Sequence, residues 1–324
     1  MLLTLSIVAL VALPAVQSDQ HLVGSSEFDH PAVSAVVLGV AQDAGYPQAN
    51  CQKKCCELAW ANASERKYVS CIAIIDSKNR KRFIFDCTPN FPAQLKLLDS
   101  QTEFETSTIV DGIFLTHAHM GHYTGLIHLG REAIGSKNVP VFGTKKMNSF
   151  LTANGPWNQL IKLSNITLNE IAPDQKIELT DQVSVTPFQV PHRDEFTDTV
   201  GFKIDTPGKS LVYLPDIDKW TKWDRSIEQV IAGTDYAMID GSFFTDGEIP
   251  GRDMALIPHP FIEESISRFA SLNSKQRQRI HFIHLNHTNP AIQFNGDPNR
   301  NSAARKIKNA GMNLARQGQT IKLN

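Results

Sequence analysis

The sequence predicts an α/β fold of the α+β kind, in which two halves fold over each other into a single-domain, four-layer αβ/βα sandwich. Short apolar runs typical of strands alternate with segments of helical spacing along the chain. Each half runs strands and then helices, the order expected when two αβ layers pack sheet against sheet. No internal repeat, low-complexity linker or clear boundary divides the chain. These observations favour one domain.

Length and composition agree with this fold class. The 324 residues with a hydrophobic fraction of 41% are enough for a sizeable core. Because 32 Lys and Arg residues nearly balance 33 Asp and Glu residues, a strongly basic surface for nucleic acid is not expected. The expected partner is a small-molecule substrate, and the sequence leaves the oligomeric state open.

The first residues are typical of a secretory signal peptide. Residues 2–16 are almost wholly apolar and small residues follow, although no Lys or Arg precedes the run. The run is shorter than the roughly 20 apolar residues that span a bilayer. We predict a signal peptide at residues 1–18, a mature chain that begins near Asp19 without stable membrane insertion, and a secreted or periplasmic protein. A membrane anchor is the alternative.

The apolar patterns predict the elements in chain order. Strands are expected where runs rich in Val, Ile and Phe end at turn residues, and helices where apolar spacing is helical and a Gly or Pro follows. The expected strands are 35–39, 68–76, 82–86, 113–115, 140–143, several within 166–190, then 211–214, 236–240, 279–285 and 320–323. The expected helices are 125–134, 145–154, 263–272 and 303–314.

Three of the eleven histidines follow one strand-like run, in the stretch IFLTHAHMGHYTG at residues 113–125. Residues two apart in extended backbone point the same way, so His117 and His119 can aim at one metal ion. His122 follows a glycine at which the chain can turn, which suits a second metal or a supporting role. Imidazole is a common ligand of zinc and iron. The alternative is a polar loop with chance histidines.

This stretch resembles the His-x-His-x-Asp-His motif of the metallo-β-lactamase superfamily, with Gly121 where the motif has aspartate. The segments VPHRDE (190–195), LPDIDKW (214–220) and HLNHTNP (284–290) are similar to the branch of pyrroloquinoline quinone biosynthesis protein B. The resemblance runs from about residue 35 to the C-terminus. It implies one metallo-β-lactamase-like domain at residues 35–324.

The resemblance implies a set of metal ligands at strand ends. His192 matches the third histidine around the first metal, and Asp216 matches the carboxylate that bridges two metals or caps one. Asp218 is the fallback carboxylate, and His287 is the rival of His284 for the last ligand. The implied ligands are His117, His119, His122, His192, Asp216 and His284.

Three further residues are candidates for supporting or catalytic roles. Asp86 stands where the superfamily has an aspartate that holds the metal loop by hydrogen bonds, and Asp240 ends another strand as a candidate acceptor. His259 lies between two prolines, and we interpret it as a catalytic proton shuttle or extra ligand, with Asp216 as the second catalytic candidate. For Asp86 and His259, an ordinary loop residue is the alternative.

Such a set supports hydrolysis, because zinc lowers the pKa of bound water to roughly 7 and polarises a carbonyl or phosphoryl oxygen. We predict a secreted metal-dependent hydrolase that uses a metal-bound hydroxide on an ester, lactone, amide or phosphoester, with one or two zinc ions. Because Gly121 supplies no oxygen, we expect a single-metal site or a weak second site. Gly121→Asp is then expected to raise the occupancy of the second metal.

Two other functions stay open. The quinone-biosynthesis resemblance implies an iron-dependent oxygenase that hydroxylates a tyrosine-type substrate, and histidines with a carboxylate suit ferrous iron. The chain departs from that branch by keeping the full histidine triplet at residues 117, 119 and 122. The remaining alternative is a non-catalytic metal-binding protein.

Five cysteines leave one thiol over if the others form disulfides. Cys51, Cys55 and Cys56 have the spacing Cys-x-x-x-Cys-Cys. At this place the resembling branch has a Cys-x-Cys-x-x-Cys cluster that holds a structural zinc. A structural metal, a disulfide in an oxidising compartment and ordinary thiols all stay open.

Overall fold

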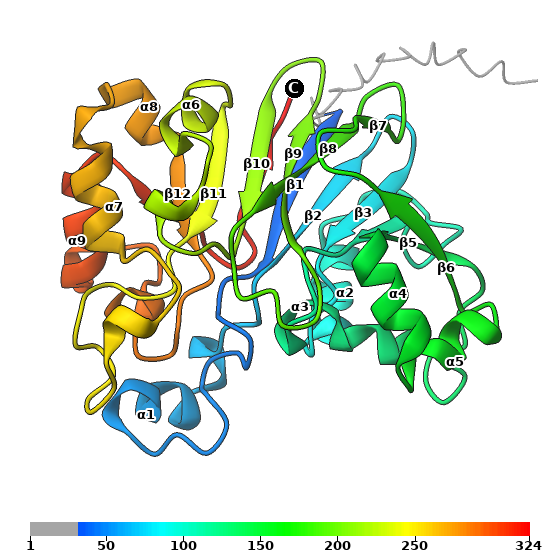
Figure 1. Ribbon diagram of the computed structural model, residues 1–324, viewed down its shortest axis with the longest axis horizontal. Coiled ribbons are helices and arrows are strands. Elements are labelled where there is room, and N and C mark those ends of the chain that lie inside the picture. The colour runs from blue at the N-terminus through cyan, green and yellow to red at the C-terminus, as the bar shows by residue number, and fades with distance from the viewer. Residues whose placement is uncertain (1–31) are drawn as a thin grey trace, which may run out of the picture. The chain divides into compact units, whose positions relative to one another are not determined.

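The computed structural model describes residues 32–324, which lie in one compact unit. Two sheets pack face to face between two layers of helices, so the predicted four-layer sandwich is confirmed (Figure 1). The predicted signal peptide at residues 1–18 lies outside the described residues. Within residues 32–324, no helix is long and apolar enough to cross a membrane.

The two sheets have the same plan. Each has seven strands, four of which form a parallel run and the rest antiparallel pairs. The first sheet contains, in spatial order, β14 (Thr320–Lys322), β1 (Val33–Gly39), β2 (Cys71–Asp76), β3 (Lys81–Phe85), β4 (Gly112–Phe114), β5 (Val139–Thr144) and β6 (Ile166–Ile171). The second contains β13 (Asn313–Leu314), β12 (Ile280–Ile283), β11 (Tyr236–Asp240), β10 (Ser210–Leu214), β9 (Thr199–Asp205), β8 (Ser184–Val190) and β7 (Ile177–Glu178).

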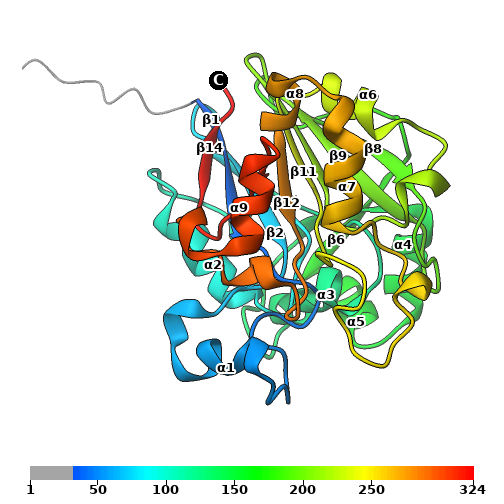
Figure 2. The same cartoon turned by 90° about the vertical axis from the view of Figure 1, so that its left-hand side faces the viewer.

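Helices cover the outer face of each sheet (Figure 1). On the first sheet lie α2 (Phe91–Ser100), α3 (Met120–Tyr123), α4 (Lys145–Ala153) and α5 (Trp157–Lys162), and on the second lie α6 (Ile227–Ala232), α7 (Ile262–Arg268), α8 (Ser274–Gln278) and α9 (Ser302–Asn309). The remaining helix, α1 (Lys54–Ala61), lies with α3 at the lower edge (Figures 1 and 2). Short 3₁₀ segments are Ala63–Glu65, Thr124–Leu129, Trp220–Lys222, Met254–Leu256, Phe269–Ser271, Pro290–Gln293 and Pro298–Arg300.

An aromatic cluster between the sheets supports the strands that lead to the lower edge. The rings of Phe85 and Phe114 stack with centroids 5.0 Å apart, and Phe202 of the second sheet meets Phe85 at 5.3 Å. All three are fully buried. Burying such a side chain stabilises the fold by about 1.5–3 kcal/mol. The cluster therefore fixes the ends of β3 and β4, from which Asp86 and the histidine loop emerge.

Two predicted helices are wrong in part. The segment predicted as helix at 125–134 is a 3₁₀ turn over Thr124–Leu129, because Gly125 packs so closely that an added Cβ would lie 2.0 Å from the Thr88 carbonyl oxygen. The helix predicted at 303–314 ends at Asn309, because Gly311 has a φ of +81° and turns the chain. Asn313–Leu314 then joins the second sheet as β13.

Candidate metal centre

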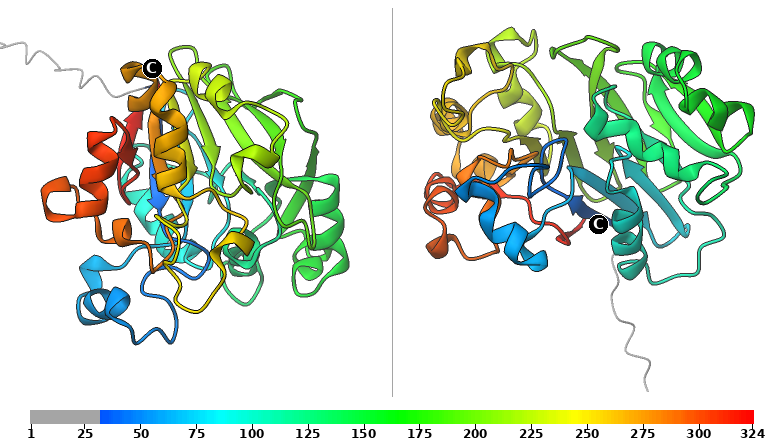
Figure 3. Two further views of the ribbon diagram at one scale, coloured as in Figure 1. Left: turned by 60° about the vertical axis from the view of Figure 1, so that its left-hand side comes forward. Right: turned by 90° about the horizontal axis from the view of Figure 1, so that it is seen from below.

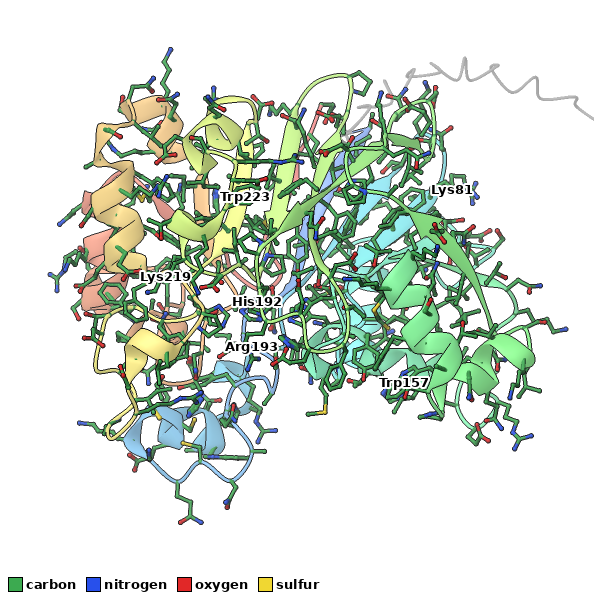
Figure 4. All side chains as sticks on the ribbon, viewed as in Figure 1. Lys81, Trp157, His192, Arg193, Lys219 and Trp223 are labelled. Carbon is green, nitrogen blue, oxygen red and sulfur yellow. The ribbon has the colours of Figure 1, made fainter. Side chains whose placement is uncertain are left out.

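Loops at the lower edge of the two sheets bring together all six predicted metal ligands, and Figure 3 shows this edge from below. Together with Asp43, which was not predicted, they form two groups, within each of which one ligand atom per residue lies within 4.8 Å of the others. The first group is His117, His119 and His192, and the second is Asp43, His122, Asp216 and His284. Asp216 lies between the groups, 3.7 Å from Nε2 of both His117 and His192. Figure 4 shows His192 between the two sheets.

The first group points two ring nitrogens at each other. His117 Nε2 lies 2.8 Å from His119 Nδ1. The other nitrogen of His119 lies 2.8 Å from Glu195 Oε2, and that of His117 lies 3.0 Å from Thr116 Oγ1. If these oxygens accept the ring protons, both facing nitrogens carry lone pairs. A cation between them would satisfy both. In metal sites, a hydrogen bond at the other ring nitrogen usually orients each histidine ligand in this way.

The second group has the same arrangement. Asp86 Oδ2 lies 2.8 Å from His122 Nδ1, so His122 Nε2 faces Asp216 Oδ2 at 2.9 Å and Asp43 Oδ1 at 3.1 Å. His284 Nδ1 lies 2.9 Å from Ser242 Oγ, and its Nε2 lies 3.2 Å from Asp216 Oδ2. Among the described residues, no donor reaches Asp216 Oδ2 with hydrogen-bond geometry. These donors fit a divalent cation such as Zn²⁺ or Fe²⁺.

The charges at the centre agree with a cation site. Burial favours a neutral Asp216, but the charges of His284 and His192 hold its pKa well below the ordinary value. Burial lowers the pKa of His192 to about 4. Burial also opposes a charged His122, but the charge of Asp86 and contacts with Asp216 and Asp43 raise its pKa well above the ordinary value. A bound cation can therefore replace the proton at His122.

Asp86 organises the histidine loop, as the sequence predicts. Its fully buried carboxylate accepts from the Thr116 N–H at 2.9 Å, the Thr116 hydroxyl at 2.8 Å and the Tyr213 hydroxyl at 3.2 Å, and it contacts His122. Its φ of +67° turns the chain out of β3 toward the loop. Aspartate tolerates this conformation better than most residues.

We expect Asp86→Asn to weaken Zn²⁺ binding about 10- to 100-fold, the usual effect of losing a group that orients a ligand. The reason is that an amide nitrogen cannot accept the proton of His122 Nδ1. The control is Asp76→Asn, since Asp76 is also fully buried and bonds Asn79 and Thr180 at the other end of the sheet. Chelator competition measures both affinities. Equal losses would show a general folding defect instead.

His259 lies beside the centre and is held by Asp240. Its Nδ1 is 2.7 Å from Asp240 Oδ2 and 3.2 Å from Ser242 Oγ, and its ring centroid is 5.4 Å from that of His192. Burial opposes the charged form, but the Asp240 carboxylate raises the pKa of His259. With Nδ1 held by Asp240, Nε2 is the nitrogen that can exchange a proton. This placement suits the predicted proton shuttle.

The two alternative ligands named from the sequence, Asp218 and His287, lie outside the metal centre. Asp218 Oδ2 pairs with Lys222 Nζ at 2.7 Å, outside both groups. His287 lines a surface pocket with Lys54 and Cys55. The sequence analysis missed Asp43, which follows β1 by four residues.

The three clustered cysteines also lie together. The sulfur atoms of Cys51, Cys55 and Cys56 lie within 4.8 Å of one another, and those of Cys51 and Cys55 are 3.7 Å apart. All five cysteines are free thiols, and Cys71 and Cys87 are buried separately. Burial raises the pKa of Cys56 to about 12. Three thiols this close together suit a soft metal ion such as Zn²⁺.

The fold and the centre define a class of protein. Residues 81–285 match the Beta-lactamase superfamily domain, and the chain belongs to this family. Within this family, the chain is similar to coenzyme PQQ synthesis protein B. It is 24% identical over 315 residues to coenzyme PQQ synthesis protein B of Methylobacterium nodulans, covering 90% of this chain and 100% of the relative. It is 26% identical to the protein of the same name from Acinetobacter baumannii, over 89% of this chain and 99% of the relative.

Solved structures show the same fold. Zn²⁺-bound PqqB from Methylobacterium extorquens has a TM-score of 0.73 at 22% identity, covering 89% of this chain and 99% of that one. A diphosphatase from the PhnP family has a TM-score of 0.61 at 19% identity, covering 89% and 96%. The short form of human tRNase Z has a TM-score of 0.53 at 15% identity, covering 90% and 99%. Enzymes with this architecture therefore include hydrolases.

Proposed function

We propose that the chain is a metal-dependent hydrolase of an ester, lactone, amide or phosphoester in a small molecule. The observation that carries this proposal is that two ligand groups meet at the buried carboxylate of Asp216, with the His259–Asp240 pair beside them. Zinc bound there would supply a water of lowered pKa and polarise the bond to be cleaved. The Zn²⁺-bound PqqB neighbour supports zinc as the metal.

The residues around the centre have separate roles in this proposal. His259, held by Asp240, gives a proton to the leaving oxygen, or to the leaving nitrogen of an amide. Glu195 holds His119 in place through its 2.8 Å contact. Arg193, which lies beside His192 in Figure 4, has a half-exposed guanidinium that can bind an anionic group of the substrate. The neighbouring Phe196 is exposed and offers an apolar contact.

An iron-dependent oxygenase is the second candidate. It is supported by relatives named for synthesis of coenzyme PQQ and by three histidines next to a carboxylate, a set that also suits ferrous iron. A non-catalytic metal-binding protein is the third. The three candidates differ in the metal that is bound and in turnover.

The test is to purify the chain anaerobically, measure its metals by elemental analysis, and reload the stripped protein with Zn²⁺ or Fe²⁺. We expect the Zn²⁺ form to hydrolyse p-nitrophenyl esters, bis-p-nitrophenyl phosphate or simple lactones, because its ligands match a hydrolytic centre. Stripped protein is the control. Oxygen uptake by the Fe²⁺ form, with no hydrolysis by the Zn²⁺ form, would favour the oxygenase instead.

The proposed enzyme is exported, and its support is the apolar run at residues 2–16. N-terminal sequencing of the protein from its native host should find a chain that begins near Asp19. An intact Met1 on the native protein would contradict export by signal cleavage.

A further inference from the structure

Gly121 stands at the motif's aspartate position, and the space that an aspartate would fill is occupied. An added Cβ at Gly121 would lie 2.5 Å from the Cα of Asp43 and 2.6 Å from its Oδ1. Real Cβ atoms do not approach other atoms this closely, and the first of these neighbours is backbone. The loop after β1 therefore places a carboxylate of its own where the motif would place one from the histidine loop.

The carboxylate of Asp43 faces the same partners that a motif aspartate would share. Its Oδ1 lies 3.1 Å from His122 Nε2 and 3.4 Å from His284 Nε2. Asp216 Oδ2 meets the same two nitrogens at 2.9 Å and 3.2 Å. Two carboxylate oxygens and two imidazole nitrogens thus converge on one point. Four such donors complete a tetrahedral zinc site.

The backbone holds Asp43 in this position. The N–H of the preceding Gln42 donates to the Leu285 carbonyl at 2.9 Å, directly beside His284. On the other side, the Gly45 N–H donates to the Gln42 carbonyl at 2.8 Å and closes a turn in which Gly45 has a φ of +75°. Asp43 is therefore fixed to the strand end that carries His284, and is not a mobile surface residue.

We propose that Asp43 is the carboxylate ligand of a second metal ion, so that the chain binds two metal ions with the motif's aspartate relocated to the loop after β1. This inference rests on the metal centre of the proposed function but not on hydrolysis itself. It replaces the single or weak site expected from Gly121. It also reverses the expectation for Gly121→Asp, because the new side chain would collide with Asp43.

The test compares four variants with the parent chain. They are Asp43→Ala, the isosteric Asp43→Asn, Gly121→Asp and the exchange variant Asp43→Gly/Gly121→Asp. Each is loaded with Zn²⁺ over a series of chelator-buffered concentrations, and zinc per chain is measured by elemental analysis. Asp205→Ala is the matched control, since Asp205 is similarly exposed and pairs with Lys203 away from the centre. Circular dichroism checks that each variant folds.

We expect two zinc ions in the parent and in Asp205→Ala. Asp43→Ala and Asp43→Asn should keep one ion and bind the second at least about 100-fold more weakly. This exceeds the usual effect of losing a residue that only orients a metal ligand. Gly121→Asp alone should bind no more zinc than the parent, and the exchange variant should regain the second ion.

Two results would overturn the inference. One is a parent chain that binds a single zinc ion at every concentration. The other is unchanged affinity for both ions in Asp43→Ala and Asp43→Asn. If zinc binding follows the inference but no substrate is hydrolysed, the proposed function fails while the assignment of Asp43 stands.

Discussion

Replacing Asp216 with alanine should remove zinc from both ligand groups and lower kcat/KM on the order of 10³-fold or more. This carboxylate lies close to histidines of both groups, with Oδ2 near His122, His284 and His117 and Oδ1 near His192. Without it, four buried imidazoles face one another with less negative charge to hold two divalent ions. Metal ions stabilise transition-state charge by several kcal/mol, and each 1.36 kcal/mol is about tenfold in rate.

Asp218→Ala is the control for this variant, because it removes a carboxylate from the same loop. Asp218 is mostly buried and pairs with Lys222 at 2.7 Å, so its loss should disturb local packing without emptying either group. Zinc content and kcat/KM are measured on both proteins. If Asp216→Ala retains two zinc ions, or if Asp218→Ala loses as much zinc, the central role given to Asp216 is wrong.

The strand-end ligands could be predicted from the sequence because their geometry is local. The spacing of His117 and His119 after β4 fixes where both side chains point, whatever the rest of the fold does. The same is true of Asp86 and Asp240, each at the end of an apolar run in the sheet. Parallel strands deliver their ends to one edge, so such residues meet in space.

Asp43 could not be predicted in this way, because its role depends on a contact between distant segments. It approaches Gly121 only because the loop after β1 is bonded to Leu285. For a similar reason, the sequence could not decide between His284 and His287 as the last ligand. His284 has a φ of +64°, which turns its side chain toward the centre at the end of β12, and no sequence pattern specifies that turn.

The partial misassignment of two helices came from glycines. Gly125 is needed for close packing against the Thr88 carbonyl, and Gly311 for a left-handed turn. Both lie inside segments whose apolar spacing is helical, so the pattern alone favours a continuous helix. In each case a backbone requirement set by tertiary contacts outweighed the local preference.

His259→Ala should lower kcat about 10²- to 10⁴-fold for substrates with poor leaving groups, the usual range for a general acid. For p-nitrophenyl substrates the loss should be much smaller, because p-nitrophenolate leaves without a proton. KM and zinc content should change little, because His259 Nδ1 is held by Asp240 at 2.7 Å, although Asp216, Asp240 and His259 also lie close enough together to form a third ligand group. This dependence on the leaving group distinguishes proton donation from a merely structural role.

Two further variants test whether His259 donates the proton and whether Asp240 acts by positioning His259. Asp240→Asn keeps the shape of the residue 2.7 Å from His259 Nδ1 but presents an amide there, so it should reproduce much of the loss for poor leaving groups. His281→Ala is the matched control, because His281 is also a buried histidine but lies on β12 and contacts the Arg279 carbonyl just before that strand. Equal losses with good and poor leaving groups in His259→Ala, or zinc loss in that variant, would assign His259 to the metal ligands and not to proton transfer.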